Sequence, residues 1–262
     1  MRLQILQQMA TYKKKASKAK NTQNTIETNS TTAEVFNTLD ETASRSEQFI
    51  IKNQKTIFIV LGLIVAGILG YLAFQKFVKA PKEKVAADEL AFPKAYFEDA
   101  LTTSVAVDSL LVLGLEGADG KYGFIDIADK FSGTKAGNLA NYYAGISHLK
   151  LKNYKEAIDY LEDFSSDDEL LGPTAKGAIG DAFADINQPK EALDYYLKAA
   201  KLRENNFSTP LYLFKAGNTA MEIENYSKAL DLFNQIKKEY PNSTEARNID
   251  IYINKATFAS KN

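Results

Sequence analysis

Three stretches of the chain repeat one pattern of apolar, small and polar residues, with starts 35 and 37 residues apart. All three have the same length, and they read NLANYYAGISHLKLKNYKEAIDYLEDF (138–164), PTAKGAIGDAFADINQPKEALDYYLKA (173–199) and PLYLFKAGNTAMEIENYSKALDLFNQI (210–236). A fixed period of about 20 to 50 residues is typical of stacked repeats, in which each unit buries its apolar face against the next. The period therefore predicts a solenoid.

Small residues recur at two points of each stretch, and a large residue follows the second point by four positions. The glycines are Gly145, Gly180 and Gly217, the alanines are Ala157, Ala192 and Ala229, and the large residues are Leu161, Tyr196 and Phe233. Small residues let two helices cross closely, while the large side chains fill the space between hairpins. The pattern predicts that each unit is a helix, a turn and a second helix.

The turns and prolines support this interpretation. A polar turn in each unit ends at Tyr154, Pro189 or Tyr226. Pro173 and Pro210 are expected at the first position of their helices, where a missing N–H costs nothing.

The small residue, the turn with its aromatic, the alanine and the large apolar residue resemble the tetratricopeptide repeat. The resemblance covers residues 138–241, and Pro241 stands where such a repeat often ends. The aromatic residue usual early in the first helix is replaced by Asn141, Lys176 and Leu213, so the units are divergent. The resemblance implies an all-α fold, with repeats at about 138–171, 172–208 and 209–241.

Two flanking segments extend the repeat domain to residues 124–262. IADKFSGTKA (127–136) resembles IKKEYPNSTEA (236–246), so residues 124–137 are expected to be a degenerate half repeat. Asn242 and Glu245 have the spacing of a capping box, which predicts a closing helix over residues 242–258.

Upstream, residues 56–75 carry no charged side chain. At about 1.5 Å per residue, twenty residues form a helix of roughly 30 Å, the thickness of a bilayer core. A buried core helix is the alternative, but the amphipathic helices elsewhere could not surround it. A cleaved signal peptide is disfavoured, because the run starts late in the chain, is too long, and no A-x-A site precedes a break. We predict a single transmembrane helix over residues 56–78.

The regions on either side of this helix are assigned from composition. Residues 1–32 are basic and polar, which predicts a disordered tail, and Met9 offers an alternative start. A juxtamembrane helix is expected over residues 33–55, and a helical connector and loop over residues 79–123.

Charge leaves the direction of the transmembrane helix open. Lysines flank it on both sides, and the local count slightly favours a cytoplasmic C-terminal side, whereas the basic tail favours the opposite. Residues 1–79 hold 11 Lys and Arg against 5 Asp and Glu, which leaves residues 80–262 with 21 against 28. This acidic C-terminal part argues against nucleic-acid binding.

Two surfaces are candidates for binding partners. Within the membrane helix, one face carries Gly62, Ala66, Gly70 and Ala73, which would let a membrane partner or a second copy approach closely; the alternative is the general abundance of Gly and Ala in such helices. In the repeats, the first helices are expected to line a concave groove for extended or helical peptides. Its expected residues are Tyr142, Ile146, Lys150, Asp181, Asp185, Phe214, Asn218 and Glu222, of which the apolar ones have inter-helix packing as the alternative.

No residue pattern indicates catalysis. The chain has no cysteine, and His148 is its single histidine, which we expect to be packed or on the surface. GLEGADGKYG (114–123) lacks the spacing of a phosphate-binding loop, and DFSSDDEL (163–170) lacks that of a calcium loop, so a flexible connector and a solvated turn are expected. The sequence predicts a non-enzymatic protein without cofactor or metal.

The order of tail, membrane helix and degenerate repeats is similar to the YfgM family of ancillary SecYEG translocon subunits, in the form found in Bacteroidota. The resemblance is strongest over IADKFSGTKAGNLANYYAGISHLKLKNYKEAIDYLEDF (127–164). It implies an inner-membrane protein with a cytoplasmic N-terminus and a periplasmic repeat domain. It also implies translocon subunits, a membrane-anchored chaperone and exported clients as partners. The tail is longer than in that family, and a cytoplasm-facing adaptor for a secretion, division or stress-response complex is the alternative.

Overall fold

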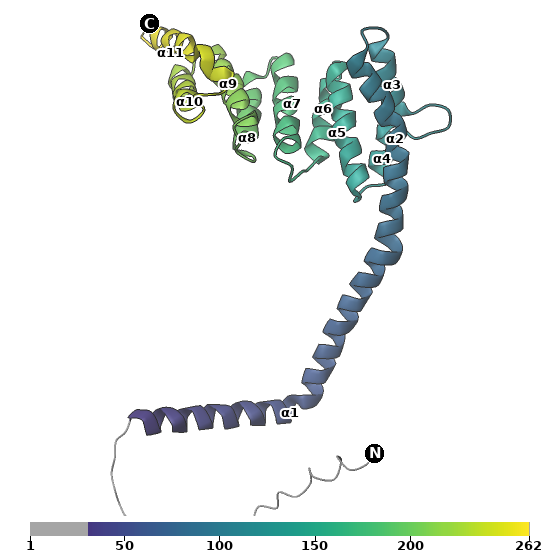
Figure 1. The fold of residues 1–262 in the computed structure, drawn as a ribbon, viewed down its shortest axis with the longest axis vertical. Helices are drawn as coiled ribbons and strands as arrows, with labels where there is room; N and C mark the ends of the chain where they lie inside the picture. Colours follow the sequence, from purple (N-terminus) through teal and green to yellow (C-terminus); the bar gives the residue numbers. More distant parts are fainter. Residues whose placement is uncertain (1–30, 262) are drawn as a thin grey trace, which may run out of the picture. The chain divides into compact units, whose positions relative to one another are not determined.

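A computed structural model of the chain describes residues 31–261, with side chains from Gln48 onward. Over this range the chain is all-helical and contains no strand (Figure 1). The expected fold class is confirmed, because one long apolar helix is followed by stacked helix pairs. The tail expected at residues 1–32 and the alternative start at Met9 lie outside the described residues, apart from Thr31 and Thr32, where the first helix begins.

The first helix, α1, runs from Thr31 to Phe74 without a break. The structure therefore joins the juxtamembrane and transmembrane helices that the sequence separated at residue 55. Residues 31–61 contain neither proline nor glycine, so nothing in them stops helix propagation. A π-helix, Gln75–Lys79, follows, and then α2, Ala80–Thr102. The chain divides into two units, up to Gly67 and from Ile68 on.

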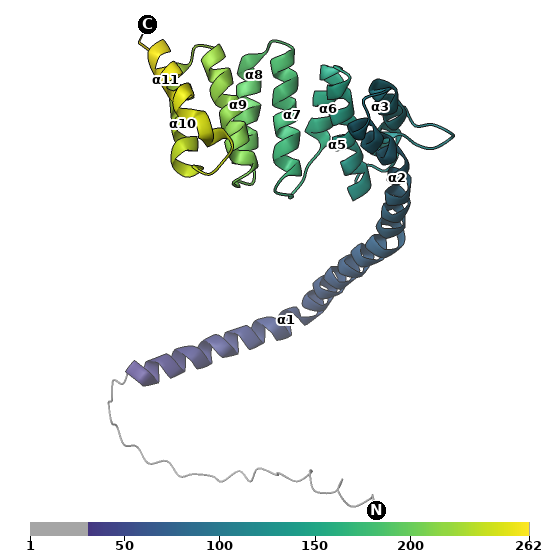
Figure 2. The same ribbon diagram turned by 45° about the horizontal axis from the view of Figure 1, so that its top comes forward.

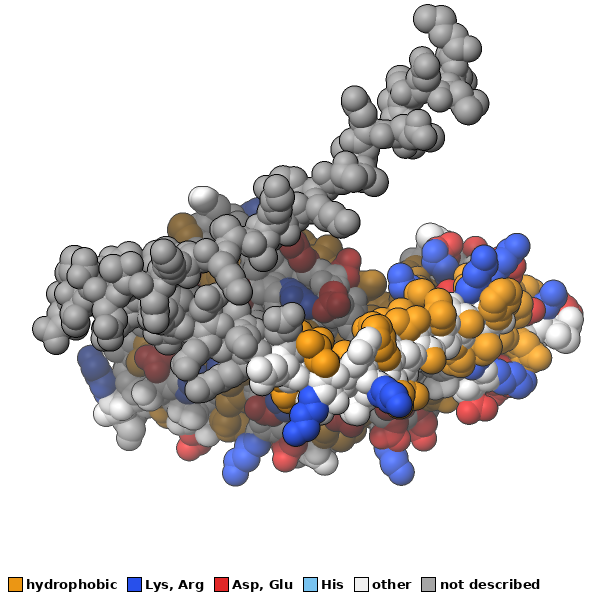
Figure 3. All heavy atoms as spheres, turned by 90° about the horizontal axis from the view of Figure 1, so that it is seen from below, with side chains coloured by type: hydrophobic (Ala, Val, Ile, Leu, Met, Phe, Trp, Pro, Cys, Tyr) orange, Lys and Arg blue, Asp and Glu red, His pale blue; other side chains and the backbone are white. Residues whose placement is uncertain are grey.

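The apolar side chains of α1 are exposed. The most apolar window of the helical stretch Gln48–Thr102 has none of its residues buried. Large residues such as Leu63 and Leu69 are 68% and 60% exposed, and Figure 3 shows hydrophobic side chains gathered along a stretch of exposed helix. In the described part of the chain, this one helix is long and apolar enough to cross a membrane.

The unit from Ile68 on contains a stack of helices that lie side by side in chain order (Figures 1 and 2). Each helix packs mainly on its neighbours in the chain, as in a solenoid. After α2, the helices are α3 Val107–Glu116, α4 Phe124–Lys130, α5 Lys135–Lys150, α6 Tyr154–Asp163, α7 Leu171–Asp185, α8 Pro189–Lys201, α9 Ser208–Glu222, α10 Tyr226–Glu239, a 3₁₀ helix Glu245–Asn248 and α11 Ile249–Ala259.

The small residues of each repeat have the role that the sequence predicted. A Cβ atom added to Gly145, Gly180 or Gly217 would lie 2.4, 2.7 or 2.4 Å from the large residue of the same hairpin. The three alanines of the second helices are fully buried. Close crossing of the helices, which requires a missing side chain at these points, thus holds each hairpin together.

The three turns inside the hairpins share one backbone conformation. Lys152, Asn187 and Glu224 have φ of 62°, 58° and 60°, in the left-handed region. The N–H of the following residue donates to the carbonyl five positions earlier, at 2.9, 2.8 and 2.8 Å. This hydrogen-bond pattern is the Schellman motif, which closes the C-terminus of a helix.

The starts of several helices differ from the sequence prediction. α7 and α9 begin at Leu171 and Ser208, so Pro173 and Pro210 occupy their third positions, still within the first turn, where an N–H would have no intrahelical acceptor. The closing helix α11 begins at Ile249, after a 3₁₀ turn in which Ser243, and not Asn242, accepts the N–H of Ala246.

Residues 79–123 are more ordered than a connector. α2, α3 and α4 share one core with α5, in which Phe124 stacks on Tyr143 at 5.1 Å and Phe97 meets the same ring edge-on at 5.1 Å. Glu83 of α2 also accepts the N–H groups of Lys135 and Ala136 at the start of α5, at 2.8 and 3.2 Å. The first repeat is therefore joined directly to the helix that follows the apolar segment.

Candidate protein-binding groove

The first helices of the hairpins, α5, α7 and α9, line the inner side of the stack. Contacts join α5 to α7 and α7 to α9, whereas the second helices α6, α8 and α10 have at most marginal contact with one another. Helices that approach one another across successive repeats lie on the concave side of a curved solenoid. The expected groove residues are all on these inner helices.

The expected groove residues fall into two groups by burial. Four of them are exposed and available to a partner: Lys150, Asp185, Asn218 and Glu222. The other four are half-buried, namely Tyr142, Ile146, Asp181 and Phe214. The three apolar members of the second group pack between helices: Tyr142 on Phe164 at 5.1 Å, Ile146 on the buried cores on both sides of α5, and Phe214 on Tyr252 at 4.7 Å.

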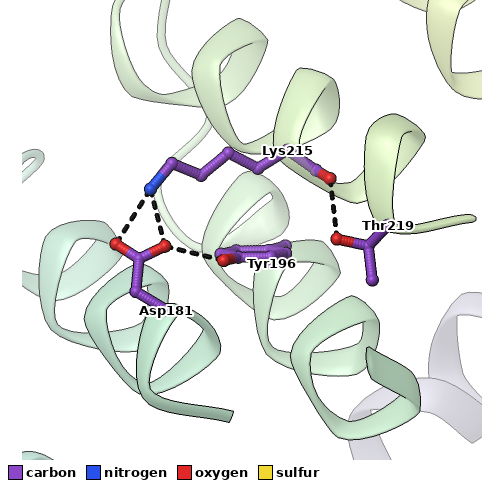
Figure 4. A network of polar contacts seen from close by, with 4 residues as sticks. All are labelled: Asp181, Tyr196, Lys215 and Thr219. Carbon is purple, nitrogen blue, oxygen red and sulfur yellow. Dashed lines mark hydrogen bonds and ion pairs between the residues drawn. The ribbon is translucent and has the colours of Figure 1, made fainter. Parts of the chain in front are cut away.

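Asp181 forms a polar network between α7, α8 and α9 (Figure 4). Its carboxylate accepts two hydrogen bonds from Lys215 Nζ at 2.6 and 2.8 Å, and one from the Tyr196 hydroxyl at 2.6 Å. Burial, and then the hydrogen bond to Asp181, raise the pKa of Tyr196 far above its usual range, so the phenol remains a donor. Asp181 therefore ties two successive hairpins together, a role that its position in the repeat did not reveal.

The next junction, between α9 and α11, has different residues at the equivalent positions. Asn218, Phe233 and Tyr252 follow Asp181, Tyr196 and Lys215 by 37 residues each. None of the three can form the ion pair, and Phe233 has no hydroxyl to donate. A cavity of about 570 Å³ opens at this junction. It is lined by Asn218, Met221, Glu222, Tyr226, Phe233, Tyr252, Lys255, Phe258 and Ala259.

The preceding junction, between α5 and α7, is closed by apolar residues. Ile146, Leu161 and Ala178 stand at the positions equivalent to Asp181, Tyr196 and Lys215. Leu161 and Ala178 are buried in one core cluster, and Ile146 packs against it. Along the inner side, the α5–α7 junction is thus filled by apolar residues, the α7–α9 junction contains an ion pair, and the α9–α11 junction contains a cavity.

A second and more polar cavity, of about 790 Å³, lies between α4, α5 and α6. The Asn138 side chain bonds both backbone groups of Ser165 across it, at 2.8 and 3.0 Å. Tyr160 lies near Asp129 and Asp163, and burial followed by these two charges raises its pKa. No repeated position of the sequence indicated this cavity.

The single histidine and the acidic loop, the candidates for catalysis and calcium binding, are both held by contacts within the fold. His148 is 8% exposed and stacks on Tyr160 at 5.4 Å, in agreement with the expected packing role. In the loop 163–170, Asp168 accepts the N–H groups of Leu170 and Leu171, which lowers its pKa, and Asp167 pairs with Arg203. The acidic loop therefore caps α7.

The small-residue face of α1 is uncovered in the described chain. Gly62, Ala66, Gly70 and Ala73 are all exposed, and no atom lies within 4 Å of a Cβ added to either glycine. Its role as a packing face for a membrane partner stays a prediction.

Comparison with known proteins supports the repeats. Family models described as tetratricopeptide repeat match residues 142–207 and 212–243. The chain is similar to Tetratricopeptide repeat protein 29 of Homo sapiens and of Macaca fascicularis, with 30% identity over 119 residues in each case. The match covers 42% of this chain and 25% of each relative, so the chain spans about a quarter of the length of the curated relatives it matches. Residues 142–207 and 212–243 are therefore tetratricopeptide repeats, which follow a long apolar helix and indicate a scaffold for protein–protein interaction.

Proposed function

We propose that the protein is a single-pass scaffold of the inner membrane, with a cytoplasmic N-terminus and a periplasmic repeat domain that receives exported proteins near the translocation channel. The observation that carries the proposal is the connection between helix and repeats. α2, which follows the apolar segment after one π-helical turn, shares a core with the first repeat helix, and Glu83 of α2 bonds the start of that helix. Such a connection would hold the groove close to the membrane.

The expected ligands are polypeptides rather than small molecules or nucleic acid. The exposed groove residues Lys150, Asp185, Asn218 and Glu222 are spread over three helices, which suits an extended or helical segment. The acidic balance of residues 80–262 disfavours phosphate contacts. The resemblance to the YfgM family supports translocon subunits and a membrane-anchored chaperone as further partners.

Protease accessibility tests the topology. In spheroplasts, a periplasmic repeat domain is digested by added protease without lysis, whereas reporter fusions before Ile57 and after Ala80 report opposite sides of the membrane. Digestion only after lysis would contradict the periplasmic placement.

Crosslinking tests the clients. A photoreactive amino acid at Asn218 or Glu222 is expected to capture exported precursors and translocon subunits. The matched control is Asn234, an exposed residue of the same repeat on the second helix α10. Recovery of cytosolic proteins alone, or equal recovery from Asn234, would rule the proposal out.

A second candidate function is a cytoplasm-facing adaptor. The lysines that follow the apolar segment favour it, because basic residues near a membrane span prefer the cytoplasm. These are Lys76, Lys79, Lys82 and Lys84. The spheroplast experiment separates the two functions, since an adaptor domain is protected until lysis.

The small-residue face of α1 is proposed to contact a partner within the membrane. Gly70→Leu should weaken co-purification of membrane partners, because the larger side chain prevents close helix approach. Gly67→Leu, on another face of the same helix, serves as the control and should have little effect. Unchanged co-purification with Gly70→Leu would count against this contact.

A further inference from the structure

The α9–α11 junction, where a cavity lies, differs from the preceding junction at three positions of the repeat register. At the preceding junction the Asp181–Lys215 ion pair and the Tyr196 hydroxyl fill the space between the inner helices. At the α9–α11 junction, Asn218 and Tyr252 replace the charged pair, and the cavity of about 570 Å³ remains. This volume is in the range of ordinary ligand pockets.

The lining of this cavity combines apolar surface with two opposite charges. Met221, Phe233 and Tyr252 provide sulfur and aromatic surface. Glu222 lies on the α9 side and Lys255 on the α11 side. Neither of them forms an ion pair within residues 48–261. A ligand with a bulky apolar group and opposite charges on its two sides would complement this lining.

We propose that this cavity anchors one large apolar side chain, such as Phe or Leu, of a bound polypeptide whose neighbouring residues are basic on the α9 side and acidic on the α11 side. The inference rests on the proposed function and deepens it, because it names the anchor residue of the peptide. Burial of the anchor supplies affinity, and the charge pair on the rim fixes the direction in which the peptide lies.

Met221 provides a direct reporter of the cavity. The chain has three methionines, and the other two, Met1 and Met9, precede the apolar helix. In the full chain in lipid nanodiscs, labelled with ¹³C at the methionine methyl groups, N-acetyl-phenylalaninamide and N-acetyl-leucinamide should shift the Met221 signal saturably. N-acetyl-serinamide is the matched probe and should not. An unmoved Met221 signal would overturn the inference.

Filling the cavity tests the anchor with peptides. For a 12-residue peptide with a central Phe between Lys and Glu, Asn218→Trp should weaken binding about 10- to 100-fold, the loss expected for one buried apolar side chain. Asn234→Trp, the same change on the second helix α10, should leave binding unchanged. Ala259→Phe fills the cavity from α11 and serves as a second variant if Asn218→Trp does not fold. Full binding by both folded variants would overturn the inference.

Reversing the rim charges tests the direction. The parent chain should prefer one of the two peptides with the orders Lys-Phe-Glu and Glu-Phe-Lys. The double variant Glu222→Lys with Lys255→Glu should prefer the other, and an unchanged preference would overturn the inference. A photoreactive amino acid at Glu222 can also be combined with Asn218→Trp. If it still captures exported proteins, the proposed function stands, but the cavity is excluded as the anchor.

Discussion

At the scale of single residues, Gly177 leaves room for the ring of Tyr212 from the next hairpin. A Cβ atom at this position would lie 2.0 Å from Tyr212 Cε1, and Tyr212 is only 6% exposed. Because the buried ring must move, Gly177→Ala should lower the free energy of unfolding by about 1–3 kcal/mol. Chemical denaturation followed by circular dichroism measures this loss.

A double variant provides the control for Gly177. With Tyr212→Ala already present, the ring is gone, so adding Gly177→Ala should cost much less than it does alone. Equal costs in the two backgrounds would show that the ring is not what excludes a side chain.

His148 should make stability depend on pH, because it is the single histidine and is buried. Its Nδ1 lies 3.4 Å from Asn153 Nδ2, and its Nε2 has no hydrogen-bond partner within the described residues. Burial lowers the pKa of His148, although Glu156 opposes the shift. The unfolded chain therefore binds the proton more readily than the folded one.

The sign of the pH effect follows from linkage. The contribution of neutral His148 to the free energy of unfolding is complete above about pH 6.5. It is lost as the pH drops towards the lowered pKa of the folded state. Denaturation at pH 7 and pH 5.5 measures the decrease. His148→Phe keeps the stacking surface for Tyr160 and should remove most of the decrease; a decrease of the same size would assign it to other groups.

Residue contacts inside one repeat were predictable from the sequence, whereas contacts between repeats were not. The close crossing at Gly180 follows from small residues that recur in every unit, although the large Tyr196, expected between hairpins, lies against Gly180 of its own hairpin. Gly177 and Tyr212 belong to different hairpins, and the residues equivalent to Gly177 are Tyr142 and Phe214. A contact that occurs once leaves no periodic signal.

At the scale of helices, the loops between hairpins are held by their capping side chains. Asn205 accepts the N–H groups of Phe207 and Ser208 at 2.9 and 2.7 Å, and its amide donates to the Glu169 carbonyl at 3.0 Å. Asn205→Ala should therefore cost about 1–2 kcal/mol of unfolding free energy, because it removes a helix cap and a link to the preceding loop.

The control for this change is Asn205→Asp. An aspartate keeps the accepting oxygen and caps as well as asparagine, but it has no N–H to donate to Glu169. Its measured cost should lie between zero and that of Asn205→Ala. Equal costs for the two variants would contradict the capping role.

Helix boundaries were harder to predict than helix existence. The half repeat expected from residue 124 begins with α4 at Phe124, and the second helices begin at Tyr154, Pro189 and Tyr226, where the polar turns end. The first helices begin earlier than their prolines suggested, because Asp168 and Asn205 cap them from the loops. Periodicity identifies the buried face of a helix, but its first residue depends on which side chain reaches the free N–H groups.

At the scale of the whole repeat unit, Glu83 joins the helix that follows the apolar segment to the first repeat. Glu83→Ala removes the acceptor of two N–H groups at the start of α5, which should cost about 1 kcal/mol locally. Hydrogen exchange of Lys135 and Ala136 should then speed up about fivefold. Thr134 caps Gly137 at 2.9 Å independently, so exchange at Gly137 provides an internal control.

The sequence predicted which helices line the inner side of the solenoid, but it did not predict which junction between them contains a cavity. Position along the first helices identified eight residues, of which Lys150, Asp185, Asn218 and Glu222 are exposed and the other four are half-buried. The same reasoning could not distinguish a closed junction from an open one. That difference depends on three residues from three helices, which only the packed structure brings together.

The three different junctions also fix the order in which the hairpins can follow one another. Asp181 requires a lysine from the hairpin that comes next, and Lys215 supplies it. If the third hairpin were spliced directly after the first, Lys215 would stand against Ile146, and an ammonium group would lack a carboxylate beside an apolar surface. The junction residues of each repeat thus match those of the repeat next to it. Duplication or exchange of whole repeats would therefore require compensating substitutions at the new junction.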